Sequence, residues 1–334
     1  MLVVFDTNVW LSEFGLNSSL GAATRFFLRK KGARIALPEV VRLETEHNLR
    51  NRLKEYIDEI SRNHRQLLTL FGKLKEIVLP DRTAIESRIA EVFSNLGVDL
   101  IEIPFPFESA RASFLKAIEK VPPSDKNQQF KDGVLWADCV QLLKSDDVFL
   151  VSEDKAFYEA RDYSRGLAKN LLSEVARSQH SIRLFPELAG LLKEIKTDVV
   201  IDEDQLASSF LEAHGQSVNN ILERNHFERG PRISLQRSLF ATELPGRLSI
   251  EFTIEYECQD ISNENRTNGR LTLRGDGMYD VDIRMFNGLR NYGESLSWLL
   301  SDGTEMMRRN RVAFLGSLVL GHREVSHTVR YKLD

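Results

Sequence analysis

Two aspartates, Asp6 and Asp154, each follow a short apolar run that has the composition of a buried β-strand. Asp6 comes after VVF and begins the tripeptide DTN, and Asp154 comes after VFLV within SEDKAF. In open α/β sheets, ligands bind at the edge formed by the carboxyl ends of the strands. The two acids are therefore candidates for one shared site. Taken singly, each has a simpler interpretation as the N-cap of the next helix, but their pairing favours a site.

Three further acids lie within helical patterns. Glu44 stands in LPEVVRLETEH, in the first turns of a long helix, with Glu39 and Glu46 as competing candidates. Asp132 and Asp138 stand in the mostly apolar segment FKDGVLWADCV. Asp132 occupies the first helical turn, where an acid also suits the helix dipole. Asp138 lies among apolar residues, so it must either face solvent or be paired.

The elements that would position these acids alternate along residues 1–196. Short β-rich runs followed by longer helical patterns predict an α/β fold with a parallel sheet sandwiched by helices. The expected strands span residues 2–5, 34–37, 98–103, 148–152 and 181–184. Ser18 and Ser19 are candidate caps of a first helix that Gly32 ends, and a very long helix is expected from Pro38 to about Lys75. Further helices are expected over 82–96, 108–120, 131–144, 155–166 and 186–196.

The pattern changes after residue 196. Residues 197–230 predict a helical connector, and residues 231–334 predict a mostly antiparallel β-rich domain, either a sandwich or a barrel. The segment 248–258 alternates apolar and polar residues, which is typical of a half-buried strand. Residues 270–286 suggest two strands joined around Gly275, Asp276 and Gly277, and residues 324–333 alternate again.

Composition sets broad limits on the protein class. A chain of 334 residues and 38.3 kDa favours two domains over one. Its net charge of -4 provides no global cationic field, so any nucleic-acid binding must use a local patch. Cys139 and Cys258 lie far apart inside apolar runs, which suggests reduced core residues. The start carries no basic leader, and no window approaches the roughly 20 apolar residues of a membrane span, so we expect a cytoplasmic protein without a membrane partner.

The motifs FDTNVW, PEVVRLE, FKDGVLW and VSEDKAF occur in this order and, over about residues 1–190, resemble the PIN-domain nucleases. The resemblance implies a pocket of acids that binds Mg²⁺ or Mn²⁺ and hydrolyses phosphodiesters of single-stranded RNA, less often DNA. It assigns the catalytic and metal-binding roles to Asp6, Glu44, Asp132 and Asp154, with Asp138 as a further candidate ligand and with Asn8 and Ser152 as supporting polar groups. The long insertion between Glu44 and Asp132 and the β-rich tail depart from the family pattern.

Such a site needs oxygen ligands and cations. Hard ions such as Mg²⁺ take carboxylate oxygens and retain several waters, so a few acids and a substrate phosphate suffice. Basic side chains would hold the nucleic-acid backbone, and the candidates are Arg25, Arg29, Lys30, Lys31, Arg50 and Lys131. The alternative for these clusters is a solvated helix face.

Two other functions compete with the nuclease hypothesis. An aspartate-nucleophile phosphatase of the haloacid dehalogenase type also places an Asp after a strand, but it needs a second Asp where this chain has Asn8. A catalytically inactive module that only binds RNA or a protein is the second alternative. Our expectation is a metal-dependent endoribonuclease, of the toxin or defence kind, whose C-terminal β domain selects the substrate or partner. An antitoxin or regulatory protein and a homo-oligomer are compatible with this expectation.

Overall fold

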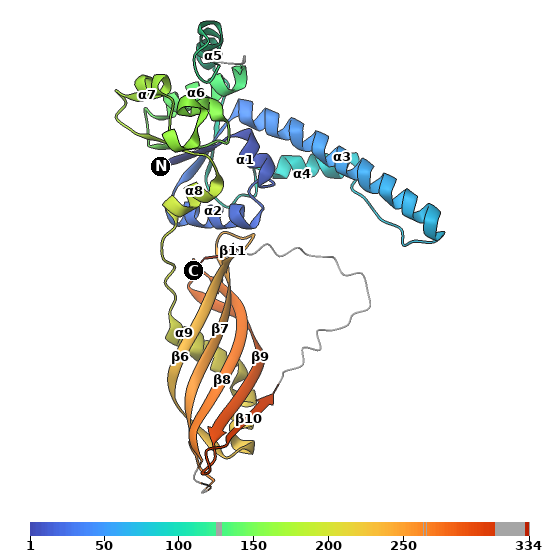
Figure 1. Ribbon diagram of the computed structural model, residues 1–334, viewed down its shortest axis with the longest axis vertical. Helices are drawn as coiled ribbons and strands as arrows, with labels where there is room; N and C mark the ends of the chain where they lie inside the picture. Colours follow the sequence, from blue (N-terminus) through green and yellow to red (C-terminus); the bar gives the residue numbers. More distant parts are fainter. Residues whose placement is uncertain (125–128, 263, 265, 311–330, 334) are drawn as a thin grey trace. The chain divides into compact units, whose positions relative to one another are not determined.

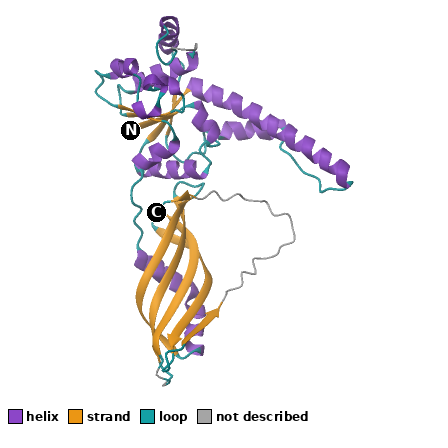
Figure 2. Cartoon of the chain, in the orientation of Figure 1, coloured by secondary structure: helices purple, strands orange, loops and turns teal. Residues whose placement is uncertain are grey.

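The computed structural model describes residues 1–124, 129–262, 264, 266–310 and 331–333 (Figures 1 and 2). Its contacts divide the chain into two compact units, Met1–Lys196 and Thr197–Asp334. Among the described residues, no helix is long and apolar enough to cross a membrane.

Unit 1 is built on a five-stranded parallel sheet of order β3-β2-β1-β4-β5. The strands are β1 (Leu2–Phe5), β2 (Arg34–Pro38), β3 (Leu100–Ile103), β4 (Val148–Val151) and β5 (Ile182–Phe185). All residues of β1 and β4 are buried, because helices cover both faces of the sheet centre. The α/β prediction for this part of the chain is confirmed.

Eight α-helices of unit 1 surround this sheet within the described residues. They are α1 (Thr7–Ser12), α2 (Ser19–Lys30), α3 (Glu39–Phe71), α4 (Arg82–Glu91), α5 (Phe107–Glu119), α6 (Phe130–Leu142), α7 (Lys169–Val175) and α8 (Leu188–Ile195). Helix α2 packs against α8 on one side of the sheet, and α6 lies on the other side, where it contacts α3 and α5 (Figure 1). The largest fully buried side chains include Trp10, Trp136 and Phe5.

Helix α3 is the long helix that the sequence predicted after Pro38. Its first half contacts α1, α4 and α6, and its second half extends away from the sheet (Figure 1). The extended half exposes large apolar side chains, among them Ile60, Leu67, Leu70 and Phe71.

The helix expected over residues 155–166 is wrong. Three short 3₁₀ turns, Lys155–Phe157, Glu159–Arg161 and Tyr163–Arg165, occupy this segment, and α7 follows them. Two local interactions explain the difference. Asp154 accepts the amide of Ala156 at 2.7 Å, and the Tyr158 hydroxyl donates to the carbonyl of Ser152 at 3.0 Å, so the chain is held close to the end of β4.

Unit 2 is one six-stranded antiparallel sheet of order β10-β9-β8-β7-β6-β11. Its strands are β6 (Phe227–Ala241), β7 (Arg247–Asp260), β8 (Thr267–Asp280), β9 (Met285–Leu299), β10 (Glu305–Asn310) and β11 (Tyr331–Lys332). The sheet curls into a half-barrel along helix α9 (Glu203–Arg224), which contacts β6 and β9 (Figures 1 and 2). The sequence suggested a connector where α9 lies, but this helix packs on the sheet. Of the strand expected over 324–333, residues 324–330 lie outside the described residues.

The hairpin expected around Gly275, Asp276 and Gly277 is wrong, because these residues lie in the interior of β8. A Cβ atom on Gly275 would stand 2.6 Å from the carbonyl oxygen of Arg290 and 2.9 Å from the ring of Phe210 on α9. The glycine therefore provides space where the helix and the neighbouring strand approach β8, at a register shift between β8 and β9. The chain turns instead between Asp280 and Met285.

Filling this space should destabilise unit 2. We expect Gly275→Ala to lower the free energy of unfolding by about 1–3 kcal/mol, because the added methyl group meets backbone as well as side chains. Urea unfolding of the full chain, followed by circular dichroism, measures the effect.

Gly215→Ala is the matched control. This glycine lies inside α9 with open space at its Cβ position, so alanine should leave stability unchanged or raise it by up to about 1 kcal/mol. Equal stability of the Gly275→Ala variant and the wild type would contradict the close approach.

Candidate functional site

The pairing of β1 with β4 brings Asp6 and Asp154 to one edge of the sheet. Phe5 pairs with Val151 at the carboxyl ends of the two strands, and the amide of Asp6 donates to the carbonyl of Val151 at 3.0 Å. The next residues of the two chains, Asp6 and Ser152, are therefore neighbours, and Asp154 follows two residues later. The edge that the sequence indicated is thus formed by two segments far apart along the chain.

Asp6 is almost fully buried, with 6% of its surface exposed. Its Oδ1 accepts the amide of Thr7 at 2.6 Å, and its Oδ2 accepts the hydroxyl of Ser152 at 2.6 Å. Burial raises the pKa of Asp6 to about 6, and the charges of Asp154 and Glu44 act in the same direction, while the two hydrogen bonds oppose the rise. The fold thus holds this carboxylate in place at a cost in solvation.

Asp154 caps the first 3₁₀ turn after β4, and it also accepts a hydrogen bond from Gln129, the residue that precedes α6. Its Oδ1 accepts the amide of Ala156 at 2.7 Å, and its Oδ2 accepts the side-chain amide of Gln129 at 2.8 Å. Its own backbone amide donates to the hydroxyl oxygen of Ser152 at 3.1 Å. Ser152 therefore links Asp6 to the backbone of Asp154.

Glu44 reaches the same edge from α3. Its Oε2 accepts the hydroxyl of Thr7 at 3.0 Å, and its Oε1 accepts the ammonium of Lys131 on α6. The competing acids on this helix have other partners. Glu39 accepts the amide of Phe105 at 2.8 Å, and Glu46 pairs with Arg42.

Asp132 joins the group from the first turn of α6. The pKa of the Asp132 carboxyl is raised to about 8, and burial is the largest cause. The charges of Asp154 and Asp6, a hydrogen bond with Asp154 and the charge of Glu44 raise it further. Asp132 is thus electrostatically coupled to the other three acids. The structure brings together the four acids named first by the sequence, which we call the carboxylate cluster: Asp6, Glu44, Asp132 and Asp154.

Asp138, the further candidate ligand, lies apart from the carboxylate cluster. It is 1% exposed, and its Oδ1 accepts the hydroxyl of Ser109 on α5 at 2.7 Å. Burial raises the pKa of Asp138 to about 6, and no charge from the cluster contributes to this shift. We therefore treat it as a buried structural acid between α5 and α6.

Several other predicted residues do not reach the site. Asn8 is exposed on α1, so its side chain is turned to solvent. Arg25 is 1% exposed and donates to the carbonyl oxygens of Asn95 and Leu96 at 3.4 and 3.2 Å, so it cannot contact a nucleic-acid backbone. Arg50 forms a bidentate ion pair with Glu86 on α4.

The basic end of α2 lies at the opposite edge of the sheet. Helix α2 runs back from the carboxyl edge, and Arg29, Lys30 and Lys31 come just before β2, whose first residue Arg34 pairs with Leu2. These three cations are exposed, and they lie at the amino edge of the sheet, whereas the carboxylate cluster lies at the carboxyl edge. Of the six predicted cations, Lys131 is the one that the structure places at the cluster.

Sequence reasoning missed two residues that orient the acids. Thr7 is buried and donates both its amide, to Asp6, and its hydroxyl, to Glu44. Gln129 donates to Asp154. Thr7 stands inside the DTN motif beside Asp6, so its position was a usable signal; Gln129 lies in a loop segment that gave none.

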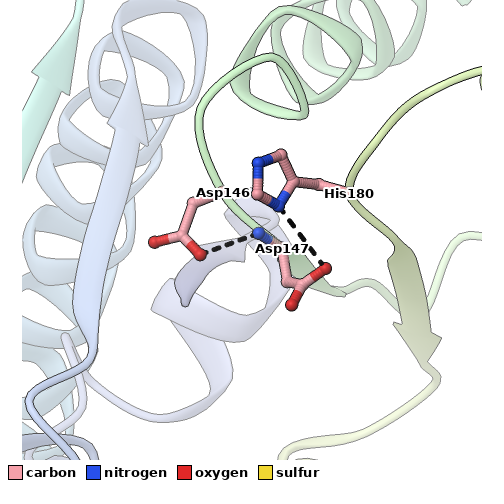
Figure 3. Close-up of side chains that lie close together, drawn as sticks. All are labelled: Asp146, Asp147 and His180. Carbon is pink, nitrogen blue, oxygen red and sulfur yellow. Dashed lines mark hydrogen bonds and ion pairs between the residues drawn. The ribbon is translucent and has the colours of Figure 1, made fainter.

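A second group of titratable residues, Asp146, Asp147 and His180, lies at the amino edge, before β4 and β5 (Figure 3). Their potential ligand atoms lie within 4.8 Å of one another. Asp146 accepts the N-terminal ammonium at 2.6 Å and the amide of Asp147 at 2.8 Å, and Asp147 accepts the amide of Ser181 at 2.8 Å. The ammonium bond lowers the pKa of Asp146, and the Ser181 bonds lower that of Asp147. These contacts explain why the three residues lie together: they connect the N-terminus to the segments that precede β4 and β5.

The donor types of the carboxylate cluster suit a hard divalent cation, although no three of its described acids place an oxygen each within 4.8 Å of one another as the second group does. They are carboxylate oxygens, without a thiol or imidazole, which is the set that Mg²⁺ and Mn²⁺ prefer. The raised pKa values of Asp6 and Asp132 reflect buried acids that repel one another, and a divalent charge between them would relieve both effects.

Comparison with known proteins gives one match. Residues 3–157 match a family model described as PIN domain. The matched segment runs from β1 through the turn that follows Asp154, so it contains every acid of the carboxylate cluster. Neither a curated protein nor a solved structure matches the chain.

Asp132→Asn should change the Tm in opposite directions relative to the wild type, upwards without metal and downwards with Mn²⁺. Asp132→Asn removes a half-buried carboxyl group that neighbouring acids repel, so in EDTA we expect the Tm to rise by about 2–4 °C. The same variant should lose the Tm increase that Mn²⁺ gives the wild type, because a ligand oxygen is missing. Asp147→Asn, in the second group, should keep the Mn²⁺ effect. Thermal melting in EDTA and in Mn²⁺ tests this; a full Mn²⁺ response in Asp132→Asn would contradict it.

Asp138 should make stability depend on pH. Burial raises its pKa from the ordinary 3.8 to about 6 in the folded chain, so between these pH values the folded chain retains a proton that the unfolded chain releases. The free energy of unfolding should therefore fall as the pH rises from about 4 to about 6, by up to about 3 kcal/mol from this group. Urea unfolding of the wild type and Asp138→Asn across this range measures it. Parallel pH profiles of the two proteins would rule out the effect.

Proposed function

We propose that the protein is a divalent-metal-dependent endonuclease that hydrolyses phosphodiester bonds, with RNA preferred over DNA, because residues 3–157 match the PIN domain, a fold of the nuclease type. The observation that carries the proposal is the carboxylate cluster, to which β1, α3, α6 and the end of β4 each contribute one acid. Structural acids rarely gather in this way, because carboxylates that are buried, as Asp6 is, or half-buried, as the other three are, repel one another and lose solvation.

In this proposal, Asp6, Glu44, Asp132 and Asp154 hold Mg²⁺ or Mn²⁺, and the bound ion supplies polarisation of the scissile phosphate and acidification of the attacking water. Thr7 and Ser152 orient the carboxylates through the hydrogen bonds described above. These polar groups act through the acids, so we regard them as positioning residues.

Lys131 provides a cation at the border of the cluster. Its ammonium donates to Glu44, and 57% of its side chain is exposed, so it can turn towards a substrate phosphate that approaches from solvent. We propose that it contacts the backbone of the bound strand, as a point charge that offsets the phosphate.

The biological role belongs to the same proposal. A PIN-type endoribonuclease of the toxin or defence kind would need control by a second protein, such as an antitoxin or a regulator. The half-barrel of unit 2 is the natural candidate for selecting the substrate or partner, because the PIN match ends at residue 157 and does not include it.

Cleavage assays with labelled RNA and labelled DNA test the enzyme directly. The wild type should cleave RNA in Mn²⁺ or Mg²⁺ and be inactive in EDTA, while Asp6→Asn and Asp154→Asn should lose more than roughly 100-fold in rate, because each removes a ligand charge. Ser152→Ala should lose about 10- to 100-fold.

Asp147→Asn is the matched acidic control and should retain wild-type activity, since this acid belongs to the group at the amino edge. Cleavage that persists in Asp6→Asn, or that resists EDTA, would refute the metal-dependent mechanism.

A further inference from the structure

An apolar pocket of about 500 Å³ opens beside the carboxylate cluster. Its walls come from the first turns of α3, from the segment before α5 and from the start of α6, and they consist of Glu39, Val40, Leu43, Glu44, His47, Asn48, Phe105, Phe130 and Lys131. Its volume lies in the range of pockets that bind small molecules or single side groups. The function proposed above does not account for this pocket.

The pocket presents aromatic and aliphatic surface to solvent next to strongly charged groups. Phe105 is 44% exposed, Phe130 is 41% exposed and Leu43 is 52% exposed. Exposed apolar surface of this kind, rimmed by polar residues, marks a binding site more often than a random surface does. The ligand must therefore offer an apolar face.

Both aromatic residues are held by the backbone. The amide of Phe105 donates to Glu39 on α3 at 2.8 Å, and the carbonyl of Phe130 accepts the hydroxyl of Ser113 on α5 at 2.6 Å. These bonds anchor the backbone of both residues at the edge of the pocket.

The pocket borders the carboxylate cluster through Glu44, which belongs to both, and through Lys131, which bonds to Glu44. Glu44 and Lys131 line the pocket, and they also bond to each other, while the second oxygen of Glu44 accepts Thr7 at the cluster. A ligand that fills the pocket therefore extends directly to the acids. Near this border it would meet the ammonium of Lys131, so the portion that leaves the pocket carries a negative charge.

We propose that this pocket binds one unpaired base of the nucleic-acid strand whose neighbouring phosphate lies at the carboxylate cluster. A base has the required flat apolar faces, which stack on aromatic rings, and its phosphate matches Lys131. His47 and Asn48 on α3 line the pocket as well and offer polar groups for the base edge. A paired base cannot enter, so the pocket selects single-stranded substrate. This proposal rests on the nuclease function proposed above.

Binding of a fluorescein-labelled single-stranded RNA to the full chain, measured by fluorescence anisotropy in Ca²⁺, tests the pocket without depending on turnover. We expect Phe105→Ala and Phe130→Ala to raise the Kd by about 10-fold or more, because one stacking contact is worth about 1–3 kcal/mol. Phe130→Leu keeps apolar volume without a ring and should show most of this loss. The same RNA annealed to its complement should bind at least about 10-fold more weakly than the single strand.

Phe114→Ala is the matched control. This phenylalanine is 58% exposed on α5 and does not line the pocket, so its variant should bind like the wild type. Unchanged Kd values for both pocket variants, or duplex binding as tight as that of the single strand, would overturn the proposal and leave the pocket to a protein ligand.

Cleavage of the same RNA in Mn²⁺ separates the two proposals. If the wild type cleaves the RNA and both Phe105→Ala and Phe130→Ala bind it normally, the base-pocket proposal is refuted and the nuclease proposal stands. A wild type that neither binds nor cleaves would remove both the nuclease function and the pocket.

Discussion

The in-register parallel pairing of β1 with β4 is the constraint on which the site depends. It sets Phe5 beside Val151, so the next residues are neighbours, and the hydroxyl of Ser152 donates to Oδ2 of Asp6 at 2.6 Å. A shift of one residue in this register would turn one of the two side chains to the other face of the sheet. The apolar runs VVF and VFLV are buried from both sides, and the register in which they pair places the polar residues at the strand ends side by side.

The carboxylate cluster lowers the stability of the fold, because its acids lose solvation and repel one another. Burial and mutual repulsion raise the pKa of Asp132 to about 8 and that of Asp6 to about 6. Hydrogen bonds from Thr7 and Ser152 oppose the rise in the pKa of Asp6, and the bond from Gln129 orients the carboxylate of Asp154. The second group shows the contrast, because hydrogen bonds lower the pKa values of Asp146 and Asp147 and its contacts tie the N-terminus to two strands.

Most of unit 1 could be predicted from sequence because its strands are compact apolar runs and its helices carry clear periodicity. The four acids were identifiable because they follow strands or begin helices, and such positions converge in a parallel sheet. The basic residues were harder, since a local charge pattern does not reveal which sheet edge a helix end faces. Arg25 is buried, and Lys30 and Lys31 end α2 at the amino edge.

In unit 2, the same limit applies to Gly275 and Gly277. A glycine in a strand that makes room for a helix gives the same local signal as a glycine in a turn, and only the packing of Phe210 against β8 distinguishes the two. Tertiary contact, absent from local sequence, decided that case. The antiparallel β prediction followed from alternation, which was clear in residues 248–258, but the curling of one sheet into a half-barrel was not predicted.

The most direct measurement for the account is a crystal of the full chain grown with Mn²⁺, with anomalous diffraction recorded at the manganese edge. The account predicts an anomalous peak coordinated by carboxylate oxygens of Asp6, Glu44, Asp132 and Asp154. A peak at Asp146, Asp147 and His180 instead, or no peak between the four acids at saturating Mn²⁺, would contradict it.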